Sequence, residues 1–145
     1  MSILVALLTV AALQSQAGPA RTITIGVDDS MKYSITAITA QPGETLRVVL
    51  VSTSTMPKLA MAHNFVLLAR GTDAAALVKA GRNSRDTDFI PAAQKEKVVA
   101  MTALAGPDET VEVTFTVPAQ KGKYEFICTF PGHYTLNMKG VLTVQ

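Results

Sequence analysis

One short stretch of the chain holds three kinds of side chain that bind soft transition metals. Cys128, His133 and Met138 supply a thiolate, an imidazole and a thioether within residues 128–138. The chain has one cysteine and two histidines, and the other histidine, His63, opens an apolar run. Two imidazoles, a thiolate and a weak thioether are the ligand combination of electron-transfer copper sites. The residue types and their spacing therefore predict a site for one copper ion.

Each of these side chains also has a simpler explanation when it is taken alone. A single cysteine often acts as a small buried hydrophobe, and His63 fits a core histidine with a hydrogen-bond partner. His133 fits a surface loop and Met138 fits ordinary core packing. Copper is favoured because both histidines and the cysteine all fall at positions that such a site requires.

The elements that must position these side chains are predicted to be strands. Several segments alternate apolar and polar residues and are rich in Val, Ile, Thr, Tyr and Phe, as half-buried strands are. These segments are residues 22–27, 46–51, 63–68, 111–117, 124–128 and 140–144. Turn-forming Gly and Pro residues separate them, as in an antiparallel sandwich. We therefore expect an all-β fold of two sheets and about eight strands, with one short helix over residues 72–81.

The N-terminal residues have the pattern of an export signal. Ile3–Leu13 is apolar but too short to span a bilayer, and Ser15, Gln16 and Ala17 resemble a signal peptidase site. We expect a signal peptide over residues 1–17, with cleavage after Ala20 as an alternative, and an uncleaved anchor as the competing interpretation. An unpaired cysteine in an exported chain favours a metal-bound or reactive sulfur. The predicted location is the periplasm, without stable membrane insertion after cleavage.

Length and charge limit the remaining function classes. The chain has 145 residues and a formal net charge of +2, which fits one domain over residues 21–145. Its basic residues are scattered and no aromatic residues interleave with a basic run, so nucleic acid is excluded as an expected partner. We expect a monomer with a single function.

Two segments resemble a known family. Residues 61–67 and the run Cys128–His133, closed by Met138–Gly140, are similar to the two copper-binding segments of azurins and auracyanins, which are cupredoxins of the plastocyanin/azurin family. The resemblance extends over nearly the whole chain after the leader. It implies a cupredoxin Greek-key β-sandwich, with the short helix in a crossover connection.

The resemblance also implies a role for each proposed ligand. Cys128 would supply the thiolate that couples most strongly to copper, and His63 and His133 would supply equatorial nitrogens. Met138 would be a long axial sulfur, and the backbone oxygen of Ala62 a weak second axial contact. Because soft sulfur favours Cu(I) and imidazole suits both oxidation states, such a set keeps the two states closely balanced.

Residues around the ligands have implied roles as well. The amides of Asn64 and Phe130 would donate to the sulfur of Cys128, and the Asn64 side chain would tie the two ligand segments together. The resemblance further implies an apolar docking patch around the edge of His133. Its residues would be Met31, Met61, Phe130, Pro131 and Gly132.

The chain departs from azurins at several positions. Ala62 stands where azurins usually have Gly, and Phe65 stands where they have Trp. Four residues separate His133 from Met138, as in auracyanins and plastocyanins, where azurins have three. The structural disulfide of azurins has no counterpart, because the chain has a single cysteine.

The expected function is that of a type 1 (blue) copper protein, a soluble one-electron carrier cycling between Cu(II) and Cu(I). Its partners would be transient redox proteins such as cytochromes or copper enzymes. We do not expect an enzyme, because the Cys and His spacing is that of a metal loop and no third histidine could hold an open catalytic metal. A periplasmic copper carrier or store is the alternative, and a zinc-filled structural module is a third.

Overall fold

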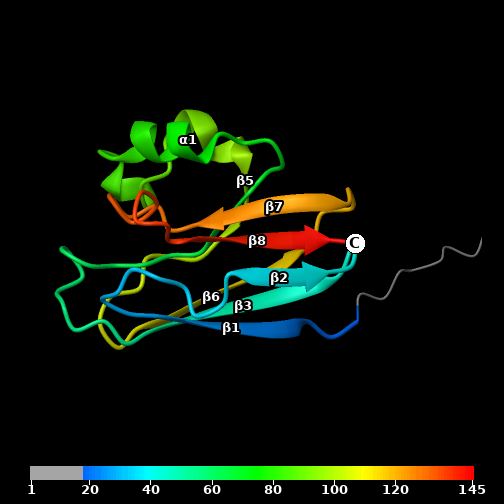
Figure 1. Cartoon of the computed structure of the whole chain (residues 1–145), viewed down its shortest axis with the longest axis horizontal. Helices are drawn as coiled ribbons and strands as arrows, with labels where there is room; N and C mark the ends of the chain where they lie inside the picture. The colour runs from blue at the N-terminus through cyan, green and yellow to red at the C-terminus, as the bar shows by residue number, and fades with distance from the viewer. Residues whose placement is uncertain (1–17) are drawn as a thin grey trace, which may run out of the picture.

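The chain forms two β-sheets that face each other (Figure 1). The computed structural model describes residues 18–145, so the expected signal peptide, residues 1–17, lies outside the described residues. One sheet has the order β1-β3-β6, formed by Arg21–Val27, Thr45–Ser52 and Thr110–Thr116. The other has the order β2-β8-β7-β4-β5, formed by Ala37–Ala40, Lys139–Val144, Gly122–Ile127, Val66–Leu68 and Val98–Met101. The predicted all-β fold with two sheets is confirmed.

Alternation of side chains gives each sheet an inner face. In β3 every second residue is buried, including Leu46, Val48 and Leu50, because successive side chains point to opposite faces of a strand. The strand pairs in parallel with β1 and antiparallel with β6. The sequence analysis did not predict β2 or β5. Both strands have four residues, which is too short for a period of two to be distinguished from chance.

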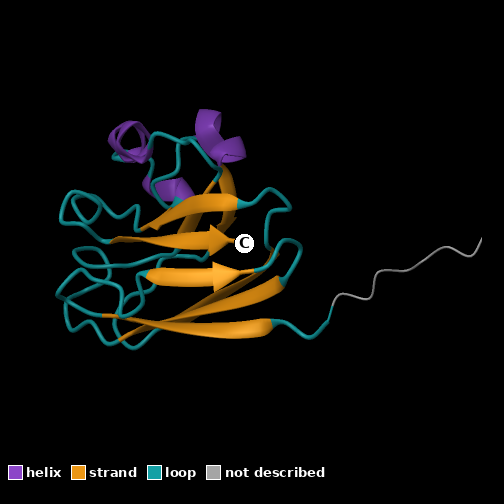
Figure 2. Cartoon of the chain, turned by 45° about the vertical axis from the view of Figure 1, so that its right-hand side comes forward, coloured by secondary structure: helices purple, strands orange, loops and turns teal. Residues whose placement is uncertain are grey.

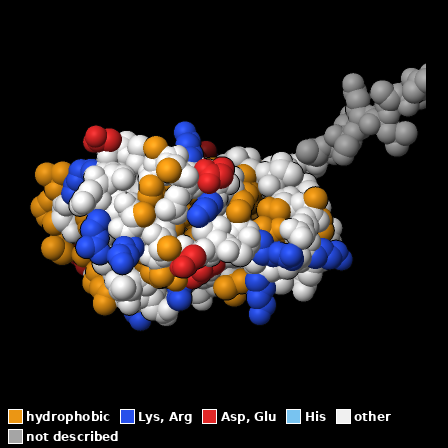
Figure 3. Space-filling view, turned by 90° about the horizontal axis from the view of Figure 1, so that it is seen from above, with side chains coloured by type: hydrophobic (Ala, Val, Ile, Leu, Met, Phe, Trp, Pro, Cys, Tyr) orange, Lys and Arg blue, Asp and Glu red, His pale blue; other side chains and the backbone are white. Residues whose placement is uncertain are grey.

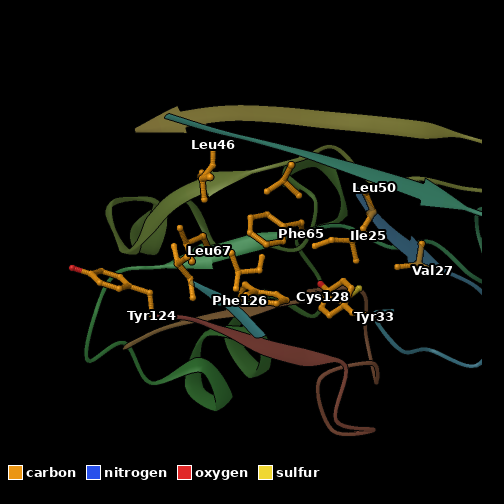
Figure 4. Close-up of a cluster of buried hydrophobic side chains, with 14 of the residues drawn as sticks. Ile25, Val27, Tyr33, Leu46, Leu50, Phe65, Leu67, Tyr124, Phe126 and Cys128 are labelled. Carbon is orange, nitrogen blue, oxygen red and sulfur yellow. The ribbon is translucent and has the colours of Figure 1, made fainter. Parts of the chain in front are cut away.

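The core lies between the sheets and extends to the sulfur of the single cysteine (Figure 4). The rings of Phe65 and Phe126 are 5.0 Å apart, and that of Tyr33 is 5.4 Å from Phe126. Cys128 and Met138 belong to the same buried cluster and have no exposed surface. Two of the four proposed ligands are therefore part of the packing that holds the sheets together.

The short helix α1 (Ala74–Gly81) lies within residues 72–81, where the sequence predicts a short helix. The side chain of Asp73 accepts a hydrogen bond from the backbone N–H of Ala76 at 3.0 Å, which satisfies an amide that the helix leaves free. Two 3₁₀ turns, η1 (Arg85–Thr87) and η2 (Ala92–Lys97), follow it. In Figure 2 all three lie on one side of the strands. None of the helices in residues 18–145 is long and apolar enough to cross a membrane.

The connection that carries α1 returns to the sheet from which it leaves. It joins β4 to β5, which are antiparallel neighbours in the five-stranded sheet, whereas the expectation was a crossover. The helix packs on that sheet through Leu77, which belongs to a second buried cluster with Ile90 and Ile127. This arrangement places α1 next to the end of β7, where the proposed metal loop begins.

A glycine allows β7 and β8 to pack against the core just beyond that loop. Gly140 is paired with Phe126 across the two strands. A Cβ atom at Gly140 would lie 2.1 Å from Cζ of Phe126 and 2.6 Å from the backbone oxygen of Thr36. Only glycine permits so close an approach, so a larger residue here would displace Phe126 or the backbone of Thr36.

Candidate metal centre

Three potential metal ligands from two segments that are distant in sequence meet at one end of the sandwich. One donor atom each from His63, Cys128 and His133 lies within 4.8 Å of the other two, and all three side chains are buried. Cys128 follows directly after β7 and His63 lies shortly before β4. Because β4 and β7 are paired antiparallel, the end of one strand lies beside the start of the other.

The loop between β7 and β8 is held by its own backbone. The N–H of Cys128 donates to the carbonyl of Met138 at 3.2 Å, and the N–H of Met138 donates to that of His133 at 3.0 Å. Gly132 has φ of 90° and Asn137 has φ of 68°, which are turn conformations that these residue types tolerate. The two ends of the loop are thus fixed by the strands and its middle by local turns.

His63 is held by contacts with other parts of the chain. Its backbone pairs with Ala105 through hydrogen bonds of 3.0 and 2.7 Å. Its Nε2 lies 3.1 Å from Oγ of Ser54, whereas its Nδ1 is buried and is the one side-chain polar atom in residues 18–145 found buried without a partner. A buried polar atom without a partner is costly. A metal ion bound to Nδ1 would satisfy it, so the site fits the copper ion that the residue types predict.

A buried hydrogen-bond network joins the two ligand-bearing segments. The Asn64 side chain donates to Oγ1 of Thr129 at 2.8 Å and accepts from the N–H of Thr129 at 2.9 Å. The Thr129 hydroxyl donates to the carbonyl of Asp88 at 2.7 Å, and that of Tyr33 donates to the carbonyl of Asn64 at 2.5 Å. Asn64 therefore links the segments as the resemblance implied, and two further segments support it.

The thiol of Cys128 lies in an apolar environment. Burial raises its pKa to about 12, although hydrogen bonds from the backbone N–H groups of Asn64 and Phe130 act in the opposite direction. Its Sγ lies 3.4 Å from Nδ1 of His133. Without a metal the sulfur stays protonated at neutral pH, so binding of a soft cation must displace that proton.

Both imidazoles are kept neutral by their surroundings. Burial, and secondarily the neighbouring His63, lowers the pKa of His133 to about 4. Burial also lowers the pKa of His63, against the opposing effect of the Asp29 and Asp28 carboxylates. Neutral imidazole is the form that binds metals. The two rings are 4.9 Å apart, which is compatible with one shared ion.

The proposed axial groups lie beside this cluster. The side chain of Met138 is fully buried, and its backbone contacts those of Cys128 and His133 as described above. The carbonyl oxygen of Ala62 is 4.0 Å from Sγ of Cys128. The assignment of Met138 and Ala62 as axial contacts stays a prediction.

The residues of the expected docking patch differ in exposure. Pro131 and Gly132 are exposed and Met31 is half-buried. Met61 and Phe130 expose only 7% and 8% of their surface. These two side chains therefore contribute little to the solvent-exposed surface of the patch.

Three exposed hydrophobic residues near the ligands were not predicted. Leu59, Leu136 and Met56 expose 75%, 55% and 42% of their surface and are the large hydrophobic residues found exposed in residues 18–145. Leu136 lies in the loop between His133 and Met138, and the other two precede His63. The sequence did contain a signal for their exposure. These apolar residues lie beside ligands in segments where apolar and polar residues do not alternate.

Fold and cluster together define a β-sandwich metalloprotein with one buried, sulfur-containing site. The family of copper-binding proteins named for plastocyanin and azurin matches residues 20–145. The chain belongs to this plastocyanin/azurin family, whose members bind copper, and its His63, Cys128 and His133 cluster is consistent with one copper ion.

Individual relatives agree with the family. Auracyanin-B of Chloroflexus aurantiacus is 37% identical over 87% of the chain, and the chain spans about half, 53%, of that protein's length. Azurin of Alcaligenes faecalis is 32% identical over 83% of the chain and 94% of its own length. The solved structure of auracyanin A, a "blue" copper protein from Chloroflexus aurantiacus, has 35% identity and a TM-score of 0.77, covering 88% of the chain and all of that structure.

Proposed function

We propose that the chain is a type 1 copper protein that carries single electrons between redox partners, with His63, Cys128, His133 and Met138 as ligands. The observation that carries the proposal is the burial of three donor groups within 4.8 Å of one another, with Nδ1 of His63 left without a partner. Donors held in place by strands and hydrogen-bonded turns change position little when the charge of the ion changes. Such a site favours fast electron exchange over chemistry on a substrate.

The side chains divide the work of such a site. When bound, copper supplies a Cu(II)/Cu(I) couple. Cys128 gives up its proton to become a thiolate, and the N–H groups of Asn64 and Phe130 stabilise the negative sulfur. Ser54 holds Nε2 of His63, so the ring presents Nδ1 as its free donor. The buried core excludes water from around these groups.

Spectroscopy tests this proposal against a copper carrier or store. Cu(II) is added to the metal-free protein, and visible and EPR spectra are recorded before and after reduction with ascorbate. An electron carrier should show an intense thiolate-to-copper band that disappears on reduction and returns on reoxidation. A protein that binds only Cu(I), without colour, would instead be a carrier or store. Zinc recovered from expressed protein decides nothing, because zinc accepts the same ligands.

Docking of a redox partner is proposed to occur at the ligand end, over the exposed edges of Pro131 and Gly132. Leu136, in the same loop, adds exposed apolar surface there, and exposed apolar patches mark interaction sites. Leu136→Glu and Leu136→Lys should both slow electron self-exchange, measured by NMR line broadening, with the copper spectrum unchanged. If both variants exchange at the parent rate, the docking surface lies elsewhere.

The chain's location and organisation are also proposals. We infer export to the periplasm by a signal peptide over residues 1–17, followed by a monomeric domain over residues 21–145. The family match, which begins at residue 20, supports this division. Mass spectrometry of the protein recovered from a periplasmic fraction tests it: a mature N-terminus at residue 18 or 21 is expected, and an intact Met1 in the membrane fraction would contradict it.

A further inference from the structure

A groove runs between helix α1 and the metal loop. It has a volume of about 600 Å³. Figure 3 views the side of the molecule on which α1 lies, and hydrophobic side chains gather there with Lys and Arg at the left-hand end. One wall is a single face of the helix, formed by Ala75, Val78, Lys79 and Arg82. The other wall is part of the metal loop, including Phe130, Pro131 and Tyr134.

The groove combines apolar walls with positive charge that no carboxylate neutralises. Lys79 and Arg82 are exposed at its helix wall, and no ion pair formed within residues 18–145 includes either residue. Nζ of Lys139 lies 5.1 Å from the ring of Tyr134 on the other wall. Its ion pair with Glu125, at 3.7 Å, is long. None of the residues that line the groove is acidic.

Favourable interaction with the end of α1 explains only part of this charge. Lys79 lies in the last turn of the helix, where a cation is stabilised by the backbone carbonyls. Arg82 lies just beyond the helix end, and both side chains line the same opening. Two uncompensated cations above an apolar floor are therefore available to a ligand.

The groove lies one side chain away from the proposed metal centre. The ring of Phe130 forms part of its wall and lies 4.8 Å from the ring of His133. Anything seated in the groove is therefore separated from a proposed copper ligand by one aromatic side chain.

We propose that this groove docks an acidic surface segment of the electron-transfer partner, with an apolar side chain in the groove and carboxylates on Lys79 and Arg82. The inference rests on the proposed electron-carrier function and adds the kind of partner that it uses. Charge complementarity at a rim speeds encounter and sets orientation more than it adds affinity. Binding is therefore weak and sensitive to salt, as turnover of a carrier requires. The groove shares Pro131 with the apolar end of the molecule, and its two cations add selection of partners by charge.

The test is an NMR titration of the ¹⁵N-labelled full chain with a short, capped peptide of Glu and Leu. Amide signals of the groove residues, from Ala75 to Arg82 and from Phe130 to Thr135, should shift. A peptide in which Lys replaces every Glu should leave them in place. The Lys79→Glu/Arg82→Glu variant should bind the acidic peptide on the order of tenfold more weakly than the parent.

A matched control separates local charge from net charge. Lys121→Glu/Lys123→Glu changes the net charge by the same amount, and these exposed residues lie at the start of β7, away from the metal loop. This variant should bind the acidic peptide within about twofold of the parent. A second variant, Ala75→Trp, fills the groove from an exposed helix position without changing charge, and should weaken binding as well.

Several outcomes would overturn the proposal. They are equal binding of both peptides, equal losses in the two charge variants, or no shift at the groove. Saturation of the same amides by inorganic phosphate at equal concentration would indicate a small-anion site instead, and binding to anionic lipid vesicles in preference to the peptide would indicate a membrane surface. Because the groove does not need copper, a protein without the visible band would refute the proposed function, whereas these titrations would still decide whether the groove binds acidic segments.

Discussion

The two segments that bring ligands to the metal centre are stabilised in different ways. The loop from Cys128 to Met138 closes on itself, with its ends bonded to each other and its middle formed by turns. The segment around His63 has a local turn only ahead of the ligand, where the N–H groups of Ala60 and Met61 donate to the carbonyl of Pro57. It depends on Ala105, Ser54 and the Asn64 network, which come from other parts of the fold.

This difference shows which part of the site is specified by local sequence and which part by tertiary contacts. The loop carries three proposed ligands in one stretch, and their spacing is visible in the sequence. The position of His63 depends on tertiary contacts, so it becomes correct only after the sheets have formed. Changes in the loop should mainly alter the chemistry of the metal, whereas changes around His63 should alter folding and metal binding together.

The largest expected effect comes from the loop. Cys128→Ser should keep the fold but lose the coloured copper site completely, because a hydroxyl is a hard and poorly ionised ligand. The measurement is the visible spectrum after Cu(II) addition, with circular dichroism as the control for folding. A serine variant that kept the intense band would refute the ligand assignment.

Removing the link between the two segments should have the next largest effect. Asn64→Ala leaves the N–H and hydroxyl of Thr129 without their buried partner and should cost about 2 kcal/mol of unfolding free energy. It should also broaden the EPR spectrum, because the ligands are no longer held in one arrangement. Urea denaturation of the metal-free protein measures the first effect. Thr129→Val, which keeps the backbone bond to Asn64, should lose less stability, and the comparison would fail if it lost more.

Met138→Leu tests the loop without disturbing its fold. The two side chains have similar volume, so the stability change should stay below about 1.5 kcal/mol. Loss of an axial donor favours Cu(I), and a tenfold change in relative affinity raises the potential by about 59 mV. Cyclic voltammetry measures it. An unchanged potential would mean that the sulfur of Met138 is not axial.

The smallest expected effects come from removing one hydroxyl group that contacts each of the two segments. Ser54→Ala removes the partner of His63 Nε2 and should cost about 1 kcal/mol and shift the potential. Thr135→Ala removes an exposed bond to the carbonyl of Gly132 and should change stability by less than about 0.5 kcal/mol. Denaturation and voltammetry on both variants check this order. Equal effects would remove the distinction between the segments.

Much of the fold could be predicted because alternation and turn residues are local signals. The expected strand at residues 46–51 matches β3, and the expected helix ends at Gly81 as observed. The expected strand at residues 63–68 is shorter in the structure, since β4 begins at Val66 and His63 forms only an isolated bridge. The local alternation of apolar and polar residues does not show where hydrogen-bonded pairing between strands ends.

The rest of the site could not be predicted because it depends on distant contacts. Ser54, Tyr33 and Asp88 carry no signal for the roles they have here. Each contacts the ligand segments only because the sheets bring its loop there. The groove beside α1 is a similar case, since its two walls are separated in sequence by β5, β6 and β7.

The complete burial of the only thiol provides a measure of how often the metal loop opens in the metal-free chain. Cys128 has no exposed surface, so an alkylating reagent can modify it only when the surrounding loop opens. The modification rate then reports how often that opening occurs, as a local excursion smaller than global unfolding. The thiol is therefore protected from oxidation for as long as those excursions are rare.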